Sequence, residues 1–209
     1  MSAECDDEAA VAGIRSLLRG AVEDLEAVHA RDEALARFVP ARRQALLLMR
    51  KSALIPIGRV WRLGVFLLGV SKAEDAATAS DPAGGPAGGR AGAPADVPAG
   101  DGVLLYATGQ TTRAVDPLYR GFQSVSAETR RDYRGAAFRG PFERGETVNF
   151  GATVIEMDAA SLRSSSGPLL LRDGEARVRW AASIDAATVP FESYLAERVE
   201  LLVHPPQGA

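Results

Sequence analysis

The chain has few of the side chains that most often carry chemistry in proteins. Its 209 residues include two lysines, two histidines, one cysteine and one asparagine. The lone Cys5 cannot form an intramolecular disulfide, so nothing indicates an oxidising compartment. Cys5, His29 and His204 offer no closely spaced pair of ligands, and we therefore expect no metal site and no cofactor.

Long hydrophobic runs are also missing. The most apolar region, residues 53–70, carries Arg59 and Arg62 near its middle, and its longest uncharged stretch is about half of what a membrane span needs. A secretory signal would begin with basic and then apolar residues. The chain begins instead with acidic residues, namely Glu4, Asp6, Asp7 and Glu8. We therefore expect a cytoplasmic protein that has no membrane partner.

No strong excess of charge of one sign is present. Arginine and lysine total 24, aspartate and glutamate total 27, and the formal net charge is −3. The basic residues are interspersed with acidic ones, so the sequence shows no broad positive field that would attract a phosphate backbone. We expect no nucleic-acid partner.

One segment is typical of disorder. Residues 73–101 are almost entirely Ala, Gly, Pro and Asp, so they cannot offset their ordering entropy by burial. The flanking apolar runs, 59–70 and 102–113, have the character of strands. We predict that both runs belong to one sheet and that 73–101 is a disordered insertion in the loop between them. The alternative is a flexible linker between two domains.

The first forty residues have a helical pattern. Apolar residues recur at steps of three and four from Val11 to Val39, and only Asp32 breaks the pattern. This spacing predicts an amphipathic helix from about Asp6 to Phe38, which Pro40 ends.

Residues 1–40 are thus expected to form an N-terminal helix, and 41–209 a single α+β domain. The apolar stripe is typical of a helix that packs on its own sheet, and the alternative is a coiled coil that pairs two copies into a homodimer. Gly13 and Gly20 favour the first alternative, because glycine lowers the stability of a helix interior.

The remaining segments complete a predicted fold. Residues 41–52 are expected to form a short helix, and residues 146–157 a strand with Val148 and Phe150 on its buried face and Asn149 on the other. Asp173 and Gly174 predict a hairpin that pairs Arg172 with Glu175. A final helix is expected from about 190 to 203. The whole is an α+β fold: a curved antiparallel sheet of about five strands, with N-terminal and C-terminal helices and a disordered insertion.

The segment YATGQTTR, residues 106–113, is the best candidate for a binding site. Its glycine lets the backbone approach a ligand, while the following side chains supply hydrogen-bond donors for a small anionic or amide ligand. The alternative is an edge strand whose threonines satisfy β propensity. The candidate ligand-binding residues are Gln110, Thr112, Arg113, Asp116 and Tyr119. The sequence identifies no catalytic residue.

Several stretches carry a family resemblance. GRVWRLGVFLLG, LYATGQTTRAVDPLYR, GETVNFGATVIEMD and FESYLAERVELL together resemble a family of short actinobacterial proteins that often bear an automatically assigned glutaminase label. The resemblance implies hydrolysis of glutamine to glutamate and ammonia. Serine-dependent glutaminases use a Ser-x-x-Lys pair, whereas Leu48 precedes Lys51 and Gly69 precedes Lys72 at that spacing, so the resemblance assigns no catalytic residue. The Gly-Glu-Thr-Val stretch alone is similar to strands of the hot-dog fold, which would imply acyl-thioester binding.

Two functions therefore remain open. The first is a non-catalytic binding or interaction module with a small-molecule ligand. The alternative is a glutaminase-type amide hydrolase.

Overall fold

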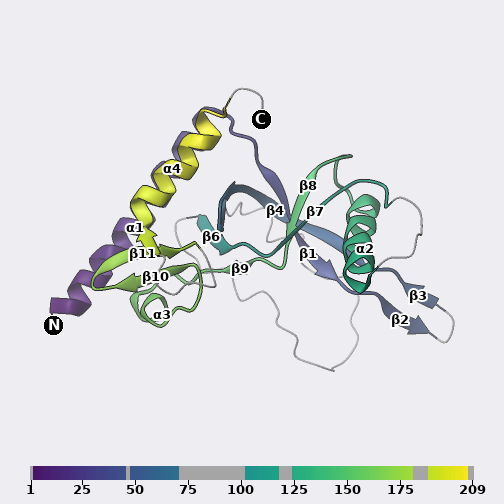
Figure 1. The fold of residues 1–209 in the computed structure, drawn as a ribbon, viewed down its shortest axis with the longest axis horizontal. Coiled ribbons are helices and arrows are strands. Elements are labelled where there is room, and N and C mark those ends of the chain that lie inside the picture. Colours follow the sequence, from purple (N-terminus) through teal and green to yellow (C-terminus); the bar gives the residue numbers. More distant parts are fainter. Residues whose placement is uncertain (1, 46–47, 71–101, 118–123, 181–187, 207–209) are drawn as a thin grey trace.

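The computed structural model describes residues 2–45, 48–70, 102–117, 124–180 and 188–206. Within them the chain has an α+β fold with four helices and sheets of seven, three and two strands. The helices are α1 (Ser2–Ala27), α2 (Val125–Arg139), α3 (Ala159–Arg163) and α4 (Phe191–Val203). Helices α1 and α4 pack together at one end of the molecule, and α2 lies at the other (Figure 1). The predicted α+β class is confirmed.

Seven strands make up the main sheet. Its spatial order is β7 (Gln110–Arg113), β8 (Thr147–Phe150), β1 (Glu33–Val39), β4 (Ala53–Leu63), β5 (Phe66–Val70), β6 (Val103–Ala107) and β9 (Thr153–Val154). Every neighbouring pair is antiparallel except β1 and β8. The prediction of about five antiparallel strands is thus only partly right. A parallel pair far apart in sequence leaves no hairpin signal to read.

The outer strands of this sheet are continuations of their neighbours in the chain. β7 follows β6 after two residues, and β9 follows β8 after two residues. β6 pairs with β9 and β7 pairs with β8, so two long segments run past each other. Gly109 lies where they cross, because a Cβ there would be less than 3.0 Å from backbone atoms of Phe150 and Gly151. Only glycine allows this close approach.

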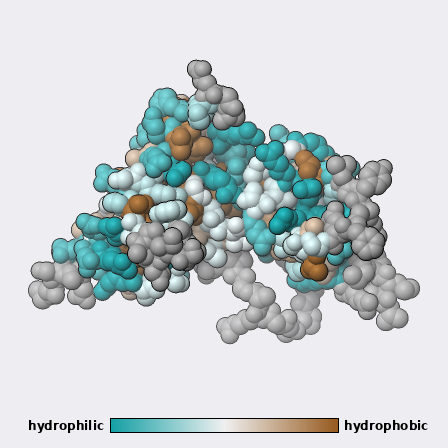
Figure 2. All heavy atoms as spheres, viewed as in Figure 1, coloured by the Kyte–Doolittle hydropathy of each residue, from teal (hydrophilic) through white to brown (hydrophobic). Residues whose placement is uncertain are grey.

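The largest core lies between the main sheet, α1, α4 and the small sheet of β10 (Leu169–Arg172), β11 (Glu175–Arg179) and β12 (Thr188–Pro190). Its largest fully buried side chains include Phe66, Phe191, Ile14, Leu25, Leu63 and Leu68. A second core lies under α2, where Ala136 and Ala137 pack on Val148 and Phe150. On the face shown in Figure 2, hydrophobic residues form only small separate groups. No helix among the described residues has both the length and the apolar character needed to cross a membrane.

The N-terminal helix is shorter than predicted. It ends at Ala27, and residues 33–39 form β1 inside the main sheet. His29 has a φ of 51°, a left-handed conformation that ends the helix. Ala34, Leu35 and Ala36 are all buried, because the sheet is covered on both faces at this point. Leu35 and Val39 are four residues apart, so they continue the helical spacing of α1 only by coincidence.

The stripe on α1 packs within the chain itself. Val11, Ile14, Leu18 and Leu25 are buried in the largest core, as expected for a helix that packs on its own sheet.

The prediction of a short helix at residues 41–52 is also wrong. This segment contains the hairpin of β2 (Arg42–Ala45) and β3 (Leu48–Arg50). Val39 of β1 pairs with Ala53 of β4, so the intervening chain must reverse direction, and it does so through this hairpin, which forms its own two-stranded sheet.

Other predictions are confirmed. Val70 pairs with Val103, so the two apolar runs share one sheet; the insertion itself, 73–101, lies outside the described residues. Arg172 pairs with Glu175 across Asp173 and Gly174, which both have positive φ. Helix α4 spans the residues expected for the last helix.

Candidate functional site

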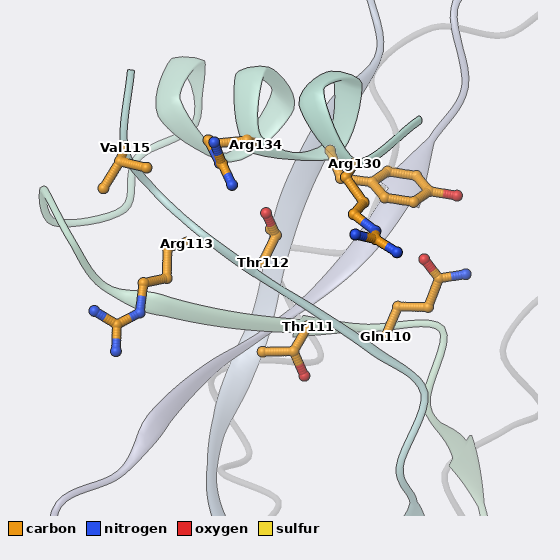
Figure 3. Close-up of a pocket in the computed structure, with 8 residues that line it drawn as sticks. Gln110, Thr111, Thr112, Arg113, Val115, Arg130 and Arg134 are labelled. Carbon is orange, nitrogen blue, oxygen red and sulfur yellow. The ribbon is translucent and has the colours of Figure 1, made fainter. Parts of the chain in front are cut away.

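A pocket of about 500 Å³ lies between β7 and α2. Such a volume is usual for sites that bind small molecules. β7 supplies four of its lining residues and α2 supplies three (Figure 3). The lining residues are Gln110, Thr111, Thr112, Arg113, Val115, Arg130, Tyr133 and Arg134.

The alternation of the strand decides which side chains of β7 face the helix. Gln110 and Thr112 point toward α2, whereas Thr111 and Arg113 point to the other side of the strand (Figure 3). Arg113 therefore lies at the rim of the pocket. β7 lies at one edge of the sheet, so the edge-strand and binding-site interpretations of this segment are compatible.

Helix α2 is held on the sheet by small residues and one aromatic cluster. Gly135, Ala136 and Ala137 are buried, and the Tyr133 ring lies 5.0 Å from Phe38 and 4.7 Å from Phe150 between centroids. This packing fixes how the helix is turned about its axis. Arg130 and Arg134, one turn apart, consequently face the pocket together (Figure 3).

The pocket is positively charged. Its described lining residues include three arginines and no acidic side chain. In the part of the chain that the structure describes, Arg113, Arg130 and Arg134 have no ion pair or hydrogen-bonded side-chain partner. Within the described residues, the Arg130 and Arg134 guanidinium groups at the pocket and that of Arg113 at its rim thus have no counter-charge.

Two nearby arginines behave differently. Arg59 pairs with Asp32, at 2.6 Å, and with Glu146, and its hydrogen bond to Asp32 does most to raise its pKa, against the opposing effect of partial burial. Arg62 pairs with Glu33 at 3.2 Å. Asp32, Glu33 and Glu146 are therefore already engaged with arginines outside the pocket.

A polar network lies on the side of β7 that faces away from α2. Asn149, 1% exposed, donates from Nδ2 to Glu33 Oε2 at 2.7 Å and to the Ala34 carbonyl oxygen at 3.3 Å. Its Oδ1 accepts hydrogen bonds from Arg62 and, at 3.1 Å, from the Thr111 hydroxyl. One amide thus connects β1, β4, β7 and β8, and fixes the strand that carries the pocket residues. The sequence predicts Asn149 on the open face of a half-buried strand; it is buried because both faces of β8 are covered.

The structure brings only part of the predicted site together. Gln110 and Thr112 line the pocket, and Arg113 lies at its rim. Asp116 is exposed and is not among the lining residues, and Tyr119 lies outside the described residues.

The contribution of α2 was not predicted. Its sequence nevertheless contains a signal, since Arg130 and Arg134 stand four residues apart. Like charges at this spacing destabilise a helix by roughly 0.2–0.5 kcal/mol. Such a pair marks a position where an external anion would be stabilising.

Among the described residues there is no group of three or more His, Cys, Asp or Glu side chains that could hold a metal ion. Comparison of the chain with protein-family models, with curated proteins and with solved structures finds no match. The function must therefore be argued from the pocket.

Proposed function

We propose that the protein is a binding module that holds a small anionic molecule in the pocket between β7 and α2. The observation that carries this proposal is the pair Arg130 and Arg134, which face the pocket together without an acidic partner in the described chain. Arginine stays charged at all physiological pH values, and its planar fork binds carboxylate and phosphate groups through paired hydrogen bonds.

The opposite wall suits the same ligand. The Gln110 amide and the Thr112 hydroxyl point toward α2, and each can donate a hydrogen bond to an oxygen atom held by the arginines. Hydrolysis would further require a nucleophile activated by a neighbouring base. The described lining residues supply positive charge and donors, which favours binding over catalysis.

The arginine pair gives a direct test. Calorimetric titration of the Arg130→Gln/Arg134→Gln variant with citrate and with phenyl phosphate should show affinities at least about 100-fold lower than wild type, because each lost charge-assisted hydrogen bond contributes about 1.5–3 kcal/mol. Arg131→Gln is the matched control: it removes the same charge from the same helix at a residue outside the lining set. It should change the affinity less than about threefold, because consecutive helix residues point about 100° apart and Arg131 does not line the pocket.

Two results would contradict the proposal. One is a wild-type protein that binds none of these anions at low ionic strength. The other is an Arg131→Gln variant that loses as much affinity as the double variant, which would show diffuse attraction instead of a site.

A separate assay addresses catalysis. Purified protein supplied with glutamine should release no ammonia above the uncatalysed background, since a binding module has no turnover. Coupled detection of ammonia over several hours measures this. Sustained release that scales with protein concentration would instead support the amide hydrolase.

A further inference from the structure

The size of the pocket indicates more than a free inorganic anion. A volume of about 500 Å³ falls in the range of sites that bind organic ligands. Val115 and Tyr133 line it together with the charged groups. The ligand should therefore combine an anionic group with an organic portion that covers these two side chains.

The charge of the pocket indicates which anionic group fits. A carboxylate brings one negative charge and two oxygen atoms. A phosphate monoester brings about −1.5 to −2 charges at pH 7 and three acceptor oxygens. Arg130 and Arg134 together carry two positive charges, and Arg113 adds a third at the rim. The dianion balances the facing pair, whereas a monoanion leaves one of the two guanidinium groups without a counter-charge.

The arrangement of donors agrees with a tetrahedral group. The guanidinium groups approach from α2, while Gln110 and Thr112 point toward them from β7 (Figure 3). Donors on two opposite walls can each bind a different oxygen of a phosphate. The two oxygens of a planar carboxylate suit a single fork on one side.

We therefore propose that the natural ligand of this pocket is a small organic phosphate monoester, with its phosphate group between α2 and β7 and its organic portion against Val115 and Tyr133. This inference rests on the proposed function and narrows it to one ligand class.

Four probes at one pH test the inference by calorimetry on the full chain. Phenyl phosphate is the monoester, methyl phenyl phosphate is the corresponding diester with a single charge, and benzoate is the carboxylate with the same ring. We expect phenyl phosphate to bind at least about tenfold more tightly than either monoanion, because one charge-assisted contact contributes about 1.5–3 kcal/mol. Inorganic phosphate, which lacks the ring, should also bind at least about tenfold more weakly than phenyl phosphate.

A variant of Arg134 shows whether its guanidinium group is responsible for the preference for the monoester over the two monoanions. Arg134→Gln should reduce the affinity for phenyl phosphate strongly and that for benzoate little, so that the preference shrinks to less than about threefold. Arg131→Gln should leave the preference unchanged. The thermal unfolding transition of each variant, compared with wild type, shows that the fold is intact.

The outcomes separate the two proposals. If no probe binds, the proposed function and this inference both fail. If the diester or benzoate binds as tightly as phenyl phosphate, the pocket binds anions but the monoester assignment is overturned. If inorganic phosphate binds as tightly as phenyl phosphate, the inference that the ligand has an organic portion is overturned.

Discussion

Replacement of Gly109 by alanine should lower the free energy of unfolding by about 3 kcal/mol or more. The added methyl group would meet the backbone of Phe150 and Gly151 at less than 3.0 Å. Backbone atoms cannot rotate away as a side chain can, so the segments containing β6–β7 and β8–β9 must separate. The loss is a large part of the 5–15 kcal/mol that usually stabilises a protein of this kind. Urea denaturation followed by circular dichroism measures it.

The control for this variant is Gly13→Ala. Gly13 lies in the interior of α1 with open space around its missing Cβ, so alanine should stabilise the helix by up to about 1 kcal/mol. The two glycine-to-alanine substitutions are thus expected to change the free energy of unfolding in opposite directions. A Gly109→Ala protein as stable as wild type would show that the two long segments do not cross as closely as described.

Replacement of Asn149 by leucine should have an effect of similar size. Leucine has nearly the same shape, but it removes one hydrogen-bond partner from each of Glu33, Arg62 and Thr111, which then keep only their bonds to one another. A hydrogen bond to a charged group contributes about 1.5–3 kcal/mol, and those to Glu33 and Arg62 are both lost, so we expect a total loss of about 3 kcal/mol. Thermal and urea unfolding both report this loss.

Thr111→Val provides a graded comparison within the same network. It removes one hydroxyl that bonds to Arg62 and Asn149 and keeps the β-branched shape that strands favour. The expected loss is about 1 kcal/mol. Equal stability of wild type, Thr111→Val and Asn149→Leu would show that the network does not stabilise the sheet.

The parts of the fold that follow local rules could be predicted from the sequence. The Asp173–Gly174 hairpin requires positive φ at both residues, and these residue types supply it. Helix α4 has a clear apolar stripe that begins directly after Pro190. In both cases the signal lies within a few residues of the structure that it specifies.

The parts that depend on distant contacts could not be predicted. β1 has the spacing of a helix, and it is a strand because β4 and β8 pair with it on either side. The burial of Asn149 likewise follows from Glu33 and Arg62, which are remote in sequence. Tertiary packing overrides local propensity at such positions.

The candidate site likewise has one half that could be predicted from local sequence and one half that depends on distant contacts. The β7 half of the pocket was predicted from Gln110 and Thr112, because the donors of an edge strand are adjacent in sequence. The α2 half was missed, since Arg130 and Arg134 become neighbours of β7 only when Tyr133 packs between Phe38 and Phe150.

The brevity of the outermost strands has a consequence for behaviour at high concentration. β7 has four residues and β9 has two, and each is the continuation of a strand that is already paired. A template this short offers few free amide and carbonyl groups to a second chain. The concentrated protein should accordingly resist self-assembly into β-rich aggregates through the borders of its main sheet.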